Sequence, residues 1–259
     1  MDASVTATAL KQSLRSDRPP LVIDVRRNER FLESPYVVEG ALRRDPSKVD
    51  EWKRTLPAAA SVVVYCVHGH EVSQGVAKAL GARYLEGGIE HWKEEGAALR
   101  AKPAGAATRW VTRERPKIDR IACPWLVRRF VDPDAEFLYV PTEEVRKTAK
   151  EKDAVAYDIP DVEFSHEGER CSFDAFLKHY RLKDPALDQL ALIVRGADTG
   201  RLGLAPQAAG LAAISLGLSI LHKNDLEMLE QGMVMYDALY AWCKQGKDEV
   251  HTWNPSLYR

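Results

Sequence analysis

The sequence predicts two domains of different class: an α/β domain with a parallel sheet flanked by helices, then a mostly helical α+β domain. The chain has 259 residues, enough for two domains of ordinary size. Before residue 100, short apolar runs rich in β-branched residues alternate with helical patterns. After residue 109, helical patterns dominate. These observations together favour two consecutive domains over a single one.

The elements of the first domain follow from its apolar runs. Residues 21–25 and 61–66 are typical of buried parallel strands. Residues 73–80 have a helical pattern with Ser73 as the expected cap, and residues 82–85 return to an extended pattern. We therefore expect an α/β domain over residues 1–101. Small and turn-forming residues indicate a linker over residues 102–108.

The second domain is expected over residues 109–259 and begins with a helical pattern at 119–130. A short strand is expected at 137–140, and a helix at 172–180 with Ser172 at its cap. Further helices are expected from Asp184-Pro185 onward, at 208–221 and at 224–242. The most apolar stretch, 205–221, is shorter than a membrane-spanning helix and carries polar residues, which predicts a buried helix.

Composition limits the partners and the compartment. With 37 Lys+Arg against 38 Asp+Glu, the formal net charge is −1, so no global field attracts nucleic acid or a membrane, and neither is expected as a partner. The four cysteines lie far apart, as expected for thiols in a reducing compartment. The N-terminus has no pattern of a secretory signal. We therefore expect a cytoplasmic protein.

Cys66 is the candidate nucleophile of the first domain. It follows an apolar strand and precedes a short loop that leads into a helical pattern. In an open parallel sheet, ligands gather beyond the carboxyl ends of the strands, and a helix N-terminus directs backbone N–H groups at an anion. The same field favours a thiolate over a thiol. The alternative is that Cys66 is only a small buried side chain.

Four segments, in order, resemble the signatures of a rhodanese domain: Leu21-Val22-Ile23-Asp24-Val25-Arg26, Val38-Glu39-Gly40-Ala41, Val64-Tyr65-Cys66-Val67-His68-Gly69-His70 and Gly87-Gly88-Ile89-Glu90-His91-Trp92. The resemblance implies a parallel sheet flanked by helices, and transfer of sulfane sulfur through a persulfide on Cys66. It implies no cofactor for this domain, and a small sulfur donor and acceptor as partners. The substrate site would comprise the loop and the strand-end acid: Val67, His68, Gly69, His70, Glu71, Val72 and Asp24.

Glu71 departs from the pattern of active rhodaneses, which often carry a basic or small polar residue at that place. A carboxylate there opposes the thiolate and repels thiosulfate. Another sulfur donor, or the sensing of an oxyanion, stays open. Val72 stands where phosphatases of the Cys-x5-Arg type carry arginine, so phosphoester chemistry is not expected.

Polar residues of the second domain form two groups of candidates. Residues 109–129 hold seven Lys/Arg against two acids, which is typical of an oxyanion site or of a solvated helix face. The candidate pocket residues are Arg113, Asp119, Arg120, Cys123, Arg195 and Asp198. A transition metal is the second expectation, because imidazole, carboxylate and thiolate are its usual ligands. The candidate ligands are His166, Glu167 and Cys171, although a capped loop leading into a helix explains the same residues.

Residues 109–243 resemble the C-terminal domain of the chromate-resistance protein B family. The segments that carry the resemblance are 111–130, 162–174, 195–199 and 232–242. With the rhodanese-like half, this implies a sulfurtransferase that contributes to chromate or oxyanion tolerance, its second domain binding or sensing an oxyanion or a metal. Two alternatives stay open: a non-catalytic chromate-responsive sensor or transcriptional regulator, and a metal-dependent oxidoreductase centred on the second domain.

Overall fold

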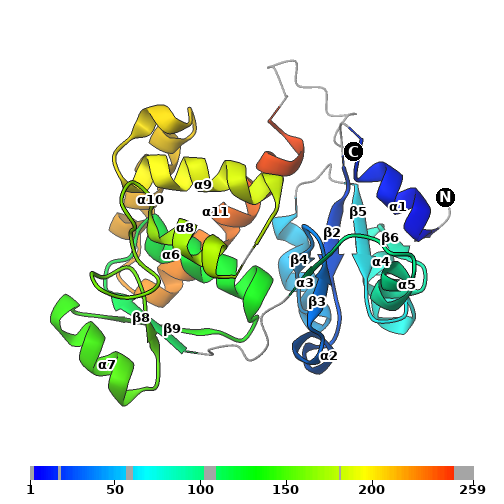
Figure 1. Cartoon of the computed structure of the whole chain (residues 1–259), viewed down its shortest axis with the longest axis horizontal. Coiled ribbons are helices and arrows are strands. Elements are labelled where there is room, and N and C mark those ends of the chain that lie inside the picture. Colours follow the sequence, from blue (N-terminus) through cyan, green and yellow to red (C-terminus); the bar gives the residue numbers. More distant parts are fainter. Residues whose placement is uncertain (1–2, 17–18, 57–60, 102–108, 181, 248–259) are drawn as a thin grey trace. The chain divides into compact units, whose positions relative to one another are not determined.

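The computed structural model describes residues 3–16, 19–56, 61–101, 109–180 and 182–247 (Figure 1). The chain forms two compact units, residues 1–104 with 237–259, and residues 105–236. The domain limits expected from the sequence, 1–101 and 109–259, stay a prediction. The expected linker, 102–108, lies outside the described residues.

The first unit is built on a parallel sheet with the strand order β1-β6-β5-β2-β4. Its strands are β1 (Ser4–Val5), β2 (Leu21–Asp24), β4 (Leu42–Arg43), β5 (Val62–Tyr65) and β6 (Arg83–Leu85). A separate antiparallel pair joins β3 (Tyr36–Val38) to β7 (Leu99–Ala101). Helices flank the sheet: α1 (Ala7–Ser13), α2 (Asn28–Glu33), α3 (Val49–Trp52), α4 (Glu71–Leu80) and α5 (Gly88–Glu94). The expected α/β class is confirmed.

Alternate residues of β2 and β5 serve two hydrophobic clusters, one on each face of the sheet. Val22 and Val63 belong to the cluster that includes Trp92 of α5, whereas Ile23 and Val64 belong to the cluster that includes residues of α3 and α4. This alternation follows from the period of two in a strand. Burial on both faces explains why these strands are continuous apolar runs in the sequence.

The second unit combines a three-stranded parallel sheet with six α-helices among the described residues. The strand order is β10-β8-β9, with β8 (Arg109–Arg113), β9 (Glu136–Val140) and β10 (Val155–Ala156). The helices are α6 (Asp119–Leu126), α7 (Val145–Glu151), α8 (Ser172–His179), α9 (Pro185–Asp198), α10 (Ala208–Leu221) and α11 (Asp225–Gln245), the last of which extends beyond this unit. As expected, the Asp184 carboxylate accepts the N–H of Ala186 and caps α9.

The single helix expected over residues 119–130 is wrong: α6 ends at Leu126, and Val127–Val131 forms a π-helical turn. Pro124 lies inside α6 and has no N–H to donate. The carbonyl of Arg120, which Pro124 would otherwise have bonded, instead accepts the hydroxyls of Tyr139 and Tyr157. The half-buried Tyr139 and the buried Tyr157 therefore satisfy the carbonyl that the proline leaves without a donor.

The buried helix expected over the stretch 205–221 is also wrong in part. Helix α10 buries Ala208, Leu211 and Ser215, but Ile220 and Leu221 near its end are 71% and 77% exposed. Composition alone therefore did not distinguish a buried helix from one with an apolar exposed face. Within the part of the chain that the structure describes, no helix is both long and apolar enough to cross a membrane.

Candidate functional site

Cys66 lies directly after β5, near the middle of the parallel sheet, and begins the loop 66–70 that connects β5 to α4. The loop is fixed to α5, because the N–H groups of Ile89 and Glu90 donate to the carbonyls of Cys66 and Val67. Gly69 has a φ of +72°, and a Cβ there would lie 2.6 Å from the Leu85 carbonyl oxygen. The loop therefore has this shape only because residue 69 is glycine.

The Cys66 thiol is buried, and its hydrogen-bond partner among the described residues is the Ser73 hydroxyl, with 3.1 Å between Sγ and Oγ. Ser73 also donates to the His70 carbonyl at 3.2 Å. The expected cap role of Ser73 is wrong: α4 begins at Glu71, two residues earlier, so Ser73 lies within the first turn. From there its hydroxyl reaches the sulfur instead of capping the helix.

A pocket of about 290 Å³ opens at Cys66, and three arginines line it together with the loop. Its lining comprises Arg26, Arg27, Arg30, Cys66, Val67, His68, His70, Glu71 and Val72. Arg27 is exposed, and no described group pairs with its guanidinium group. Arg30 forms an exposed ion pair with Glu33, which solvent screens strongly. Cationic groups therefore share the pocket with the Glu71 carboxylate.

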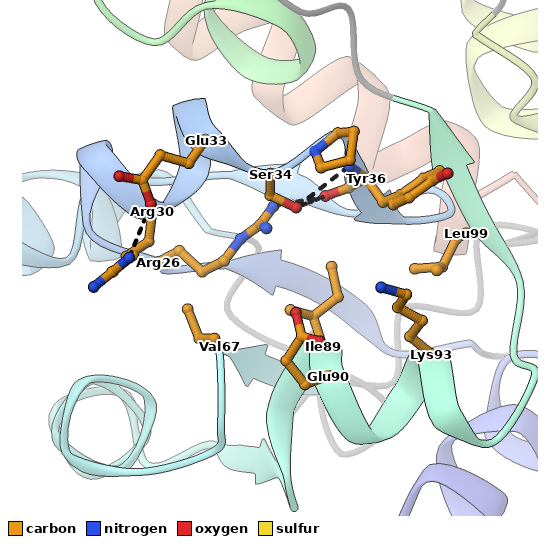
Figure 2. Close-up of a pocket in the computed structure, with 11 residues that line it drawn as sticks. Arg26, Arg30, Glu33, Ser34, Tyr36, Val67, Ile89, Glu90, Lys93 and Leu99 are labelled. Carbon is orange, nitrogen blue, oxygen red and sulfur yellow. Dashed lines mark hydrogen bonds and ion pairs between the residues drawn. The ribbon is translucent and has the colours of Figure 1, made fainter.

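A second pocket, of about 220 Å³, shares Arg26, Arg30 and Val67 with the first. Figure 2 shows Arg26 and Ser34, from the segment between β2 and β3, on one side of this pocket, and Val67 and Ile89 on the other. The two pockets are therefore neighbours along the Cys66 loop.

Asp24 is not among the residues that line either pocket. Asp24 and Arg26 form an ion pair of 2.6 Å with side chains that are each 1% exposed, and the Tyr65 hydroxyl donates to Asp24 at 2.8 Å. Burial opposes ionisation of Asp24, but the charges of Arg26 and Arg43 together with the hydrogen bonds from Arg26 outweigh burial and hold the pKa of Asp24 below its usual value. Arg26 also donates to the Tyr36 carbonyl. Asp24 thus positions Arg26, and its expected role as a substrate ligand stays a prediction.

In the second unit, three expected residues, Asp119, His166 and Asp198, lie together. His166 Nε2 is 3.1 Å from Asp198 Oδ2 and 3.7 Å from Asp119 Oδ2. A fourth residue, Asp158, was missed in the sequence, and its Oδ1 is 3.4 Å from the same nitrogen. Asp158 follows the short apolar strand β10, much as Asp24 ends β2, so the same signal would have found it.

The carboxylates of this cluster repel one another. Burial, and then the neighbouring Asp198 and Asp158, raise the pKa of Asp119 well above its usual value. Burial and Asp158 likewise raise the pKa of Asp198. The Ser172 backbone N–H donates to Asp119 at 2.6 Å, and its hydroxyl donates to Asp158 at 2.8 Å. Ser172 is the first residue of α8 and Cys171 is its cap, so the expected cap role of Ser172 is wrong.

Glu167 lies outside this cluster, whereas the Cys171 thiol lies beside it and hydrogen-bonds to Asp119. Glu167 is exposed and pairs with Lys178 at 2.8 Å. Cys171 is buried, and burial together with the nearby Asp119 raises the pKa of its thiol. Of the expected ligands His166, Glu167 and Cys171, His166 belongs to the group that the described residues bring together with Asp119 and Asp198. The expected ligand set stays a prediction.

The expected pocket arginines are engaged by carboxylates. Arg113 and Arg120 contact Asp158 at 2.9 and 3.4 Å, and Arg195 makes two hydrogen bonds to Asp174. These pairs leave the guanidinium groups partly neutralised.

Cys123 lies within α6 and is fully buried, and this burial raises the pKa of its thiol well above the usual value. The structure therefore separates Cys123 from solvent.

A five-stranded parallel sheet with a cysteine-bearing loop before α4 defines a rhodanese-like unit, and residues 6–95 match the rhodanese-like domain. Residues 110–243 match the family described as ChrB, C-terminal domain. The chain therefore belongs to the ChrB C-terminal domain family and carries a rhodanese-like domain before that region. Both resemblances expected from the sequence are confirmed.

Individual relatives cover parts of the chain. Protein ChrB of Cupriavidus metallidurans is 35% identical over 133 residues, which are 51% of this chain and 40% of that protein. The chain thus spans less than half the length of this curated relative. A rhodanese-related protein from Thermoplasma volcanium is 24% identical and has a TM-score of 0.33, covering 37% of this chain and 95% of its own. A rhodanese-like domain protein from Staphylococcus aureus has a TM-score of 0.33 at 24% identity, over 39% of this chain and 98% of its own.

Proposed function

We propose that this chain is a rhodanese-type sulfurtransferase that carries sulfur as a persulfide on Cys66. The observation that carries the proposal is the position of Cys66, after a central parallel strand, in a loop before a helix N-terminus, and at a pocket lined by arginines. At such a position, backbone N–H groups of the loop and of the helix N-terminus are directed at a bound anion. An anionic sulfur donor would bind to the cationic side chains of the pocket.

The proposed reaction moves one sulfur atom in two steps. The Cys66 thiolate attacks the sulfane sulfur of a donor such as thiosulfate, a new S–S bond forms, and the old S–S bond breaks with its electron pair leaving on sulfite. A nucleophilic acceptor then takes the outer sulfur and returns Cys66 to the thiolate. Atoms and electrons balance without a cofactor.

Backbone groups of the loop suit an anionic persulfide. Among the described hydrogen bonds, none is donated by the backbone N–H groups of residues 67–72. Unpaired N–H groups in a curled loop and at a helix N-terminus stabilise negative charge. The Ser73 hydroxyl, 3.1 Å from the sulfur, adds a donor when Cys66 is a thiolate. The thiolate and the persulfide are therefore both supported by neutral donors.

The exposed arginines supply the site for the donor's oxyanion group. Arg27 and Arg30 line the pocket beside Glu71. Substituting Arg27 by glutamine is expected to raise KM for thiosulfate while leaving kcat within about twofold, because Arg27 binds the donor and does not touch the transferred bond. The control is Arg54→Gln, another exposed arginine that lines neither pocket. Equal KM values in both variants would place the donor elsewhere.

The membership of the second unit in the ChrB C-terminal domain family supports a role in chromate or oxyanion tolerance. We propose that sulfur transfer at Cys66 serves this tolerance and that the second unit binds a ligand. A growth assay on chromate, comparing cells that carry wild type with cells that carry Cys66→Ser, tests the link. Equal tolerance in both strains would separate sulfur transfer from chromate resistance and favour a non-catalytic sensor.

The assay that tests the enzyme directly is steady-state sulfur transfer from thiosulfate to cyanide by the full chain. Wild type is expected to turn over, and Cys66→Ser to lose the activity. The matched control is Cys243→Ser, because Cys66 and Cys243 are 6% and 5% exposed. Activity retained in Cys66→Ser, or lost equally in Cys243→Ser, would overturn the assignment.

A further inference from the structure

Three carboxylates from separate parts of the second unit surround one imidazole nitrogen. Asp119 begins α6, Asp198 ends α9, and Asp158 follows β10. His166 Nε2 lies 3.1 to 3.7 Å from an oxygen of each. Elements that are distant in sequence thus deliver four polar groups to one point, which is typical of a built site.

The charges at this point do not balance. Asp158 is compensated by Arg113 and Arg120. In the described part of the chain, the carboxylates of Asp119 and Asp198 each form an ion pair with His166 alone. Asp119 and Asp198 therefore have fewer cationic partners than Asp158, although the charge of Arg120 also acts on Asp198. Buried carboxylates without full compensation are costly.

One oxygen of Asp119 points independently to a ligand at this site. Asp119 is fully buried, and its Oδ2 accepts the Ser172 N–H at 2.6 Å. Its Oδ1 is buried and has no oxygen or nitrogen hydrogen-bond partner among the described residues. The neighbouring Cys171 thiol, a weak donor, is the other group that stabilises this carboxylate. A buried carboxylate oxygen without a partner costs free energy, and a bound cation removes that cost.

The spacing of the donor atoms fits a metal ion. Ligand atoms of Asp119, His166 and Asp198 lie within 4.8 Å of one another. Nitrogen and oxygen ligands at about 2.0–2.2 Å from a metal are separated by roughly 3–4.4 Å, depending on the angle between them. The distances of 3.1 and 3.7 Å from His166 to the two aspartates fall in this range.

We propose that Asp119, His166 and Asp198 bind a divalent first-row transition-metal cation. One imidazole and two carboxylates suit Mn²⁺, Fe²⁺ or Zn²⁺ better than Ca²⁺, which takes oxygen ligands only. His166 is 41% exposed, so water or a substrate oxygen has access to the remaining coordination positions. Ser172 orients the aspartates from behind through its backbone N–H and its hydroxyl.

This inference narrows the ligand-binding role proposed for the second unit to a cation, and it does not depend on sulfur transfer at Cys66. Three carboxylates at one point exclude an oxyanion from binding directly to them, because like charges repel. An oxyanion could reach this point only through the metal. The competing explanation is a metal-free network in which a protonated His166 pairs with the aspartates.

The test uses the full chain, stripped with a chelator and titrated with Mn²⁺. Bound Mn²⁺ is measured by the loss of the free-ion electron paramagnetic resonance signal, and heat is measured by calorimetry. Wild type is expected to bind one equivalent. Asp198→Asn is expected to weaken affinity by more than about 100-fold, the upper range for changes in groups that merely support a ligand. Asp119→Asn should do the same.

The matched control is His179→Gln, because His179 is also 41% exposed and pairs with a carboxylate, Glu163, at 2.7 Å. Its affinity should equal that of wild type. Cys66→Ser should also bind normally, which separates this site from the first unit. Circular dichroism shows whether Asp119→Asn folds, and Asp198 lies at a helix end where the amide is tolerated.

Binding that is absent in wild type would overturn the proposal and leave the metal-free network. Binding that persists in both asparagine variants would overturn it as well. Neither result would alter the thiosulfate assay, so the two proposals fail independently.

Discussion

Replacing Gly69 by alanine tests how the loop around Cys66 is held. Gly69 has a φ of +72°, and an added Cβ would lie 2.6 Å from the Leu85 carbonyl oxygen and 2.8 Å from the Gly87 nitrogen. Both are backbone atoms, which cannot rotate away. A positive φ costs alanine about 1–2 kcal/mol, and overpacking adds about 1–3 kcal/mol, so we expect a loss of about 2–5 kcal/mol in the free energy of unfolding.

Gly81→Ala is the matched control. Gly81 has a φ of +63° but no atom within 4 Å of the added Cβ, so only the backbone cost of about 1–2 kcal/mol applies. Urea unfolding, monitored by hydrogen exchange in peptides of the first unit, measures the free energy of unfolding of both variants. The thiosulfate assay measures their sulfur-transfer activity. Gly69→Ala should lose most activity, whereas Gly81→Ala should keep it. Equal destabilisation, or normal activity in Gly69→Ala, would refute the argument.

Three further changes probe the same site. Asp24→Asn leaves the buried Arg26 without its carboxylate and should lower the free energy of unfolding by about 3–5 kcal/mol. The control is Asp50→Asn, whose side chain is 84% exposed and whose stability should stay close to that of wild type. Because the pKa of folded Asp24 lies below its ordinary value of 3.8, the stability that Asp24 adds is present above that pH and is lost as the pH falls through the folded pKa; acid titration of stability should therefore be flatter in Asp24→Asn. Glu71→Gln removes an anion from the pocket and should raise kcat/KM for thiosulfate about fivefold, because the Glu71 carboxylate repels thiosulfate by about 1 kcal/mol. A decrease in kcat/KM would contradict this electrostatic reasoning. Ser73→Ala removes the hydroxyl beside Cys66 and should slow persulfide formation about fivefold, because one hydrogen bond contributes about 1 kcal/mol. Unchanged single-turnover kinetics would show that Ser73 does not contribute to the reaction.

The parallel sheet of the first unit was predictable because its strands are buried on both faces. Leu21–Asp24 and Val62–Tyr65 are continuous apolar runs, and such runs are a direct consequence of burial between two helical layers. The position of Cys66 followed from the same pattern, because a strand end, a loop and a helix are local in sequence.

The roles of two serines were not predictable from local patterns. Ser73 and Ser172 both stand where a helix was expected to begin, and serine is a preferred cap. In the structure each lies inside its helix, and its hydroxyl contacts a site residue, Cys66 or Asp158. A serine that caps a helix and a serine that contacts a site residue look the same in the sequence, and only the tertiary structure distinguishes them.

In the second unit, local composition did not predict the ion pairs, because their partners lie far apart in the sequence. The excess of Lys and Arg over residues 109–129 predicts a cationic surface, but Arg113 and Arg120 contact Asp158, which lies outside that segment. The aspartates around His166 come from positions between 119 and 198, and no spacing rule joins them. Their convergence depends on how α6, α9 and β10 pack, and that information is not local.

The most direct test of sulfur transfer is the intact mass of the protein after one exposure to thiosulfate without an acceptor. Wild type and Cys243→Ser are expected to gain the mass of a single sulfur atom, which cyanide then removes. Cys66→Ser is expected to gain none. Added sulfur in Cys66→Ser, or no added sulfur in wild type, would contradict the assignment of Cys66 as the sulfur carrier.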